Sequence, residues 1–162
     1  MGSDPPLMSH ANHRVLPVLI MLAMAGFNTP ASAGLGGDSS SIRVDSARLR
    51  GQLVSTSMLQ FERHDITTSA GGTVHEYLSP SGKVFAVTWH AQLPPDLKQL
   101  FGMYFEPFRS AMVAQSGPGT HRRVAVVRPD LIVQAFGHVR DFKGMAYVPS
   151  LVPAGVDPSS LQ

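Results

Sequence analysis

The chain of 162 residues contains no cysteine. Disulfide bonds are therefore excluded. The lipid anchor of a bacterial lipoprotein is excluded as well, because that anchor is attached to a cysteine. The fold must depend on packing and hydrogen bonding.

Charge is scarce too, since charged residues make up 15% of the chain and the formal net charge is +2. Most of the cations are arginines, and they are scattered along the sequence. Proteins that bind nucleic acids usually concentrate positive charge in a dense patch or stripe. We therefore expect no nucleic-acid partner.

Motifs that carry known catalytic or cofactor chemistry are also missing. The sequence has no Gly-x-Ser-x-Gly nucleophile elbow, and its glycine clusters lack the lysine of a phosphate-binding loop. None of the histidines beyond residue 33 has the spacing that places metal ligands on one helical face. These histidines are His64, His75, His90, His121 and His138. The sequence thus indicates no catalytic residue, no metal and no cofactor.

The first 33 residues have the three parts of a secretory signal peptide. A weakly basic segment, 10–14, precedes an apolar run, 15–27, and Ala31 and Ala33 form the cleavage pattern before Gly34. The apolar run is shorter than the roughly 20 residues that a membrane-spanning helix needs. We therefore expect cleavage after Ala33, export to the periplasm or beyond, and no membrane span in the processed chain.

Beyond this leader, the sequence predicts a single domain over residues 34–148 and a flexible tail over 149–162. The length suits one hydrophobic core, and the tail is rich in proline and serine without periodicity. Loose helical spacing predicts a short helix over 44–53. Apolar alternation from Met58 predicts a strand that ends at Ala70-Gly71-Gly72.

The clearest local pattern is a β-hairpin with strands 73–79 and 83–90. Its loop, Pro80-Ser81-Gly82, combines a proline that presets a type I turn with a glycine that accepts a left-handed conformation. This loop predicts that His75 lies opposite Val87, and it places His75 and His90 on opposite faces. The face expected to form the main core carries His75, Tyr77, Phe85, Val87 and Trp89.

After Pro94-Pro95, apolar residues at helical spacing predict one long amphipathic helix with a kink or break at Pro107. Three further strands are predicted over 122–128, 131–138 and 143–148. These elements predict an α+β fold in which a β-meander, the long helix and a second β-meander follow one another. The meanders would form an antiparallel sheet with the helix packed on one face.

One group of basic residues is a candidate anion-binding patch. His121, Arg122 and Arg123 are consecutive, and Arg128 and Arg140 lie on later strands. Together they could bind an acidic polysaccharide or a phosphorylated lipid headgroup. Solvated strand ends explain the same residues more simply, because short charge runs usually face water.

Four segments carry a family resemblance, and together they span most of the chain beyond the leader. They are Leu35-Gly36-Gly37, residues 74–89, Pro95-Asp96-Leu97 together with residues 100–105, and residues 131–138. In these segments the chain resembles a family of small exported proteobacterial proteins catalogued as domain of unknown function 2844. The resemblance implies export and a shared fold, and it brings no catalytic or binding residues with it.

The leading hypothesis from the sequence is a non-enzymatic periplasmic or secreted module that binds an envelope or extracellular partner. One alternative is a cell-envelope enzyme, which would require His64, Glu76 or His90 to meet in a concave pocket. Another alternative is a surface structural component that assembles through exposed sheet edges. The identity of the partner and the oligomeric state stay open.

Overall fold

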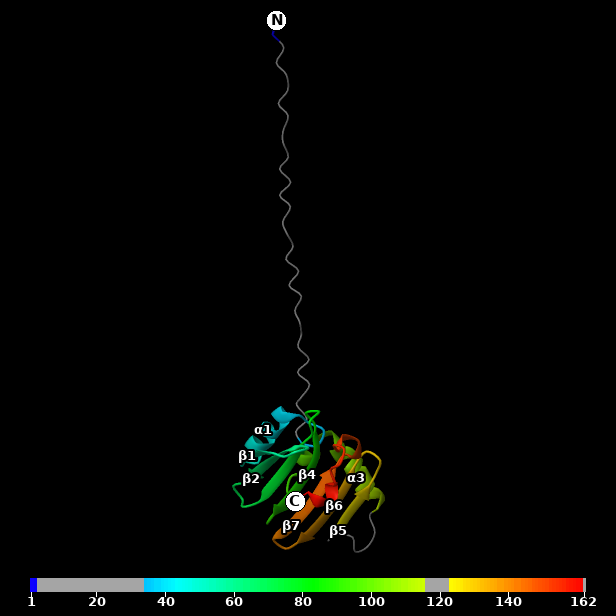
Figure 1. Ribbon diagram of the computed structural model, residues 1–162. Helices are drawn as coiled ribbons and strands as arrows, with labels where there is room; N and C mark the ends of the chain where they lie inside the picture. The colour runs from blue at the N-terminus through cyan, green and yellow to red at the C-terminus, as the bar shows by residue number, and fades with distance from the viewer. Residues whose placement is uncertain (3–33, 116–122, 162) are drawn as a thin grey trace.

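Seven antiparallel strands form one sheet in the computed structural model, which describes residues 1–2, 34–115 and 123–161 (Figure 1). The strand order is β1-β2-β3-β4-β7-β6-β5, so two meanders are joined where β7 pairs with β4. The strands are β1 (Gln52–Ser57), β2 (Glu62–Thr67), β3 (Thr73–Leu78), β4 (Val84–Ala91), β5 (Arg123–Val127), β6 (Ile132–His138) and β7 (Asp141–Tyr147). The predicted α+β fold with an antiparallel sheet is confirmed.

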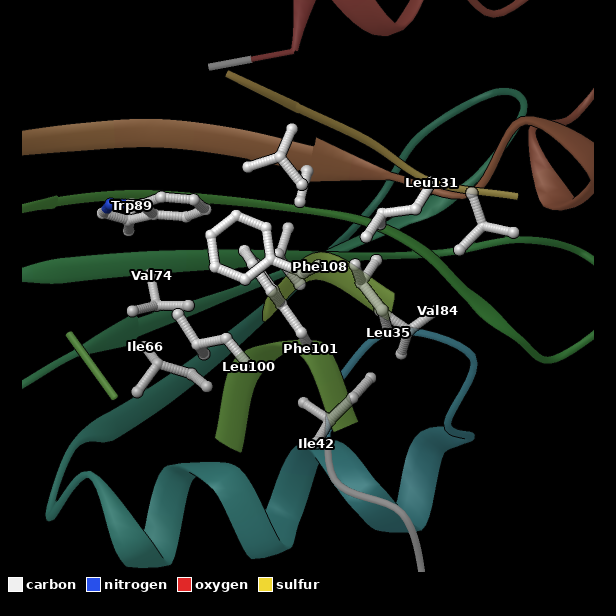
Figure 2. Packing of buried hydrophobic residues seen from close by; sticks show 14 of the residues in the cluster. Leu35, Ile42, Ile66, Val74, Val84, Trp89, Leu100, Phe101, Phe108 and Leu131 are labelled. Atoms are coloured by element: carbon white, nitrogen blue, oxygen red, sulfur yellow. The ribbon is translucent and has the colours of Figure 1, made fainter. Parts of the chain in front are cut away.

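Helices cover one side of the sheet, which we call the helix face. They are α1 (Ser39–Arg48), α2 (Leu97–Phe101), the short 3-10 helix η1 (Gly102–Tyr104) and α3 (Phe105–Ala114). Helix α1 lies at the β1 end of the sheet and α3 at the β5 end (Figure 1). The main core lies between helices and sheet, where the ring centroid of Phe101 is 5.9 Å from that of Trp89 and 5.0 Å from that of Phe108 (Figure 2).

The predicted long helix is interrupted at Gly102 and not at Pro107. Gly102 has a φ of 51°, a left-handed value that glycine adopts at little cost and that ends α2. Pro107 lies in the first turn of α3, where its missing N–H group has no helical partner to lose. The proline therefore fits the start of a helix, and the glycine makes the break.

Helix α1 begins earlier than the helix predicted over 44–53. The Asp38 carboxylate caps it by accepting two backbone N–H groups at 2.8 and 3.2 Å. The end of the predicted helix belongs to β1, because Leu53 pairs there with β2. Alternation did not reveal β1 since Ser55 and Ser57 occupy the same face of the strand as Leu53.

The β3–β4 hairpin forms around the predicted loop, but a β-bulge changes its register beyond the loop. Leu78 pairs with Val84, whereas Tyr77 pairs with Ala86. Phe85 is therefore an extra residue in β4. Side chains alternate between the two faces of a strand. The extra residue therefore moves the β4 residues beyond it to the face opposite to the one predicted from the loop.

The shift corrects the predicted faces of the hairpin. His75 lies opposite Thr88, so the predicted pairing with Val87 was wrong. Val87 and Trp89 point into the main core on the helix face. His75 and His90 share the opposite side of the sheet, although the sequence had placed them on different faces.

The side of the sheet away from the helices, which we call the open face, has a second hydrophobic cluster. It contains Tyr77, Phe85, Ala86 and Leu161. The C-terminal segment covers this cluster with two 3-10 helices, η3 (Pro149–Leu151) and η4 (Pro158–Ser160). In place of the flexible tail that we expected, residues 149–161 pack on the sheet. Apolar side chains of this segment, such as Leu161 at 8% exposure, hold these residues there.

Candidate functional site

A groove of about 560 Å³ crosses the part of the open face that the C-terminal segment leaves uncovered. Directly opposed residues of antiparallel strands share a face, so the side chains of the groove lie in rows across the sheet. One row contains His75, Thr88, Met145 and Gln134, and the next contains His90, Lys143 and Phe136. Ser159 and Leu161 of the C-terminal segment complete the lining.

Carboxylates hold both histidines of the groove. Nδ1 of His75 lies 2.6 Å from Oδ1 of Asp65, and Asp65 also pairs with Nε of Arg63 at 2.9 Å. Nε2 of His90 lies 2.9 Å from Oδ1 of Asp141. These contacts orient the two rings, and a ligand would use the second ring nitrogen of each.

Opposite charges balance one another in the groove. Nζ of Lys143 lies 3.5 Å from Oδ2 of Asp141. Desolvation raises the pKa of Asp141, but hydrogen bonds and positive charge from His90 and Lys143 outweigh it and leave the pKa below its usual range. Asp141 is therefore ionised at neutral pH, and the groove is polar without a strong excess of one charge.

Phe136 adds an aromatic surface to the groove. The residue is 38% exposed, and Cζ of Arg123 lies 4.9 Å from the ring centroid, within cation–π distance. Met145 and Leu161 add further apolar surface. The groove thus combines hydrogen-bonding groups with apolar contact area, which is typical of sites that bind small polar molecules.

The structure separates the members of the predicted anion-binding patch. His121 and Arg122 lie outside the described residues. Arg123 lies beside the groove, whereas Arg128 follows the other end of β5 and pairs with a neighbouring carboxylate at 2.9 Å. Arg140 lies in the turn between β6 and β7, with a φ of 63°. Of the three described arginines, Arg123 is the one that the fold brings to the groove, and the patch as a whole stays a prediction.

The structure describes the residue that follows the predicted cleavage site but not those that precede it. Ala31 and Ala33 lie outside the described residues, whereas Gly34 is described and buried. Gly34 has a φ of 83°, and a Cβ atom there would lie 2.1 Å from the carbonyl oxygen of Leu100, so a larger residue does not fit. The backbone N–H of Leu35 donates to the same carbonyl at 2.9 Å. The expected start of the processed chain is therefore part of the core.

A second group of polar side chains lies on the helix face, where Ser55 is exposed and the other members are buried. Ser55, His64 and Glu76 are directly opposed on β1, β2 and β3. Oγ of Ser55 lies 2.7 Å from Nδ1 of His64. Asp45 of α1 interacts with Glu76, and both of these acidic residues are 0% exposed. We call Asp45 and Glu76 the buried carboxyl pair.

Burial controls the protonation of these groups. Desolvation raises the pKa of Glu76 to about 9, and the charge of Asp45 and a hydrogen bond with it act in the same direction. Desolvation also raises the pKa of Asp45, against the hydrogen bond that Nε2 of Gln99 donates to its Oδ1 at 2.9 Å. Desolvation lowers the pKa of His64. At neutral pH Glu76 is therefore the protonated member of the pair.

The enzyme hypothesis required accessible reactive groups. The fold does bring His64 and Glu76 together, but Glu76 has no exposed surface and His90 lies on the open face. A substrate could not reach the buried carboxyl pair in this conformation. Within the described part of the chain, no three histidine or acidic side chains are arranged to hold a metal ion.

The fold and the groove define a small α+β protein with one antiparallel sheet, helices on one face and a polar groove on the other. The chain belongs to the family described as Protein of unknown function (DUF2844), whose model matches residues 31–161, so the resemblance seen in the sequence is confirmed. No curated protein and no solved structure matches the chain. Among residues 1–2, 34–115 and 123–161, no helix has the length and apolar character to cross a membrane.

Proposed function

We propose that this protein is exported and binds a ligand in the open-face groove without transforming it. The observation that carries the proposal is the composition of that groove. Two histidines held by carboxylates, a lysine, a glutamine and an exposed aromatic ring line one depression. His75 and His90 are paired with acids and not with a nucleophile, so the arrangement favours binding over covalent catalysis.

The ligand class that suits this groove is a hydroxyl-rich molecule of low charge, and we propose a short saccharide of the cell envelope. Lys143 is compensated by Asp141, so a strongly anionic ligand would meet no dense positive charge in the groove, with Arg123 beside it as a further cation. Sugar hydroxyls both donate and accept hydrogen bonds, which suits His75 and Gln134. The apolar side of a sugar ring would pack on Phe136.

Export is the second part of the proposal, and the leader supports it. Ala31 and Ala33 precede Gly34 in the pattern that a signal peptidase cuts. Cell fractionation followed by intact-mass measurement tests this part. We expect a periplasmic or secreted chain that begins at Gly34. A full-length chain in the cytoplasmic fraction would contradict export.

Isothermal titration calorimetry with a panel of envelope oligosaccharides tests the binding part. We expect saturable binding of at least one of them, and roughly 3- to 10-fold weaker binding by Phe136→Ala because it loses the aromatic contact. Gln134→Ala should weaken binding too. Val113→Ala is the matched control, since Val113 is exposed on α3, away from the groove. Equal affinities for the Phe136 variant and the wild type would contradict the proposed site.

A further inference from the structure

The buried carboxyl pair lacks a compensating cation within the described residues. Apart from the proton that Glu76 shares with Asp45, Oδ2 of Asp45 and both carboxyl oxygens of Glu76 have no hydrogen-bond donor in the described part of the protein. Buried carboxylates usually receive charge-assisted hydrogen bonds or an ion pair, because an uncompensated buried charge is costly. At neutral pH these two buried carboxyl groups therefore depend on one shared proton.

Side chains from β2, α2 and α1 surround the pair, but they do not donate hydrogen bonds to Oδ2 of Asp45 or to the carboxyl oxygens of Glu76. His64 of β2 lies opposite Glu76, but its Nε2 faces Oε1 of Glu62 at 3.6 Å and makes no hydrogen bond in the described part of the protein. Gln99 of α2 satisfies only Oδ1 of Asp45. The charge of Arg48 on α1 acts on Asp45 from a distance, as the least of the influences on its pKa.

One backbone segment already lies close to Asp45 of the pair. Gly34 lies against the backbone of Gln99 and Leu100, and the side chain of Gln99 donates to Oδ1 of Asp45 at 2.9 Å. The backbone of Gly34 also lowers the pKa of Asp45 by hydrogen bonding. The segment that follows is held in place by hydrogen bonds from Leu35 N to Leu100 O at 2.9 Å and from Gly36 N to Val84 O at 2.8 Å. The position of the Gly34 nitrogen is thus fixed by contacts on its C-terminal side.

We propose that the α-amino group released by cleavage before Gly34 becomes the counter-ion of the buried Asp45–Glu76 carboxyl pair. This inference rests on the export and cleavage proposed above. Hydrolysis by a signal peptidase consumes one water: the C–N bond between Ala33 and Gly34 breaks, and hydroxyl goes to the Ala33 carbonyl. The nitrogen of Gly34 gains hydrogen and becomes an ammonium group below its pKa of about 8.

Cleavage would change one neutral N–H donor into a cation with three donors. The ammonium group can donate hydrogen bonds to Oδ2 of Asp45 and to the carboxyl oxygens of Glu76. The hydrogen bond from Gln99 to Oδ1 of Asp45 is retained. In the uncut chain Glu76 must keep its proton, whereas in the processed chain it can ionise against the ammonium group. Removal of the leader would then complete an electrostatic interaction of the core, and processing would change how stability depends on pH.

Two forms of the protein test the inference. The uncut chain is made by cell-free synthesis without membranes, and the processed chain is recovered from cells and identified by its intact mass. Unfolding by urea is followed from pH 5 to pH 9. We expect the stability of the uncut chain to fall throughout this range. The processed chain should keep a level profile to about pH 8, where an unperturbed α-amino group titrates.

Acetylation of the α-amino group in the processed chain, carried out in urea before refolding, provides a second readout in case the uncut chain folds poorly. It should restore the fall of stability with pH. Glu76→Gln should abolish the difference between acetylated and free chains, whereas Glu106→Gln, which changes an exposed glutamate of α3, should preserve it.

The two possible failures are distinguishable. A first residue other than Gly34 would overturn this inference and count against the proposed cleavage. A first residue at Gly34 with the same pH profile before and after acetylation would overturn the ammonium–carboxyl interaction alone. Binding of saccharides in the groove is measured separately and depends on neither result.

Discussion

Replacing Glu76 by glutamine should remove most of the pH dependence of folding in the chain whose residues 33 and 34 are still joined. The amide keeps the size of the side chain and can donate a hydrogen bond to Asp45, but it cannot ionise. The pKa of Glu76 is raised to about 9 in the folded protein, from 4.5 for an ordinary glutamate. Between these values the folded state holds one more proton than the unfolded state. Stability is therefore greatest below pH 4.5 and falls as the pH rises toward 9.

One proton corresponds to about 1.4 kcal/mol of unfolding free energy per pH unit. Between pH 5 and pH 8 the proton on Glu76 alone should therefore lower the free energy of unfolding of the wild type by about 4 kcal/mol. Asp45 adds to the fall at the acid end, because burial raises its pKa as well and the two carboxyl groups titrate as a pair. Glu76→Gln should show a nearly level profile, and it should be more stable than the wild type at pH 8.

Urea unfolding at several pH values measures this effect directly. Trp89 is the single tryptophan and is 4% exposed, so its fluorescence reports on the main core. Glu106→Gln is the control, because it removes an exposed carboxylate of α3 that pairs with Arg109, and it should keep the wild-type slope. A wild-type stability that is level or rises between pH 5 and pH 8 would refute the protonated state of Glu76. So would a Glu76→Gln variant that keeps the slope.

Three further variants test the packing. Gly34→Ala should lower stability by roughly 2 kcal/mol or more, because the added Cβ would meet the Leu100 carbonyl and the positive φ strains alanine. Thermal unfolding measures this loss, and an unchanged midpoint would contradict the burial of Gly34. Gly144→Ala should cost about 1–3 kcal/mol, because its Cβ would lie 2.5 Å from Cζ2 of Trp89; near-ultraviolet circular dichroism should show the altered tryptophan environment, and an unaltered spectrum would count against this contact. Leu161→Ala should cost about 2–3 kcal/mol by removing a side chain buried on the open face; a change below about 0.5 kcal/mol in urea unfolding would instead favour a loose C-terminal segment.

Local signals in the sequence predicted much of the fold. The predicted Pro80-Ser81-Gly82 loop forms, and a hydrogen bond from Ser79 N to Lys83 O at 2.8 Å closes it. The strand predicted from Met58 begins later, at Glu62, because Met58 N donates to Phe61 O at 2.9 Å and closes a turn. Turn chemistry and periodicity act within a few residues, which is why they can be seen in the sequence alone.

Long-range packing decided what the sequence could not predict. The bulge at Phe85 depends on the fit of β4 between the helices on one face and the C-terminal segment on the other. The sequence could have indicated that Glu76 is buried, since it alternates with Val74 and Leu78 on the helix face. Its partnership with Asp45 could not be read in the same way, because α1 and β3 are separated by two strands along the chain.

The candidate groove shows the same limit. His75 and His90 were visible as histidines in the hairpin, but their common face follows from the bulge. Gln134, Lys143 and Phe136 join them only because β7 pairs with β4 across the two meanders. A groove assembled by strand order has no short sequence signature.

The most direct test of the central claim, that the open-face groove is the ligand site, is chemical-shift mapping by nuclear magnetic resonance during titration with an envelope oligosaccharide. The largest changes should occur at His75, Gln134 and Lys143 and at the ring of Phe136, with small changes at Val113 on α3. Saturable changes confined to the helices or to the β1 edge, with the groove residues unmoved, would contradict it.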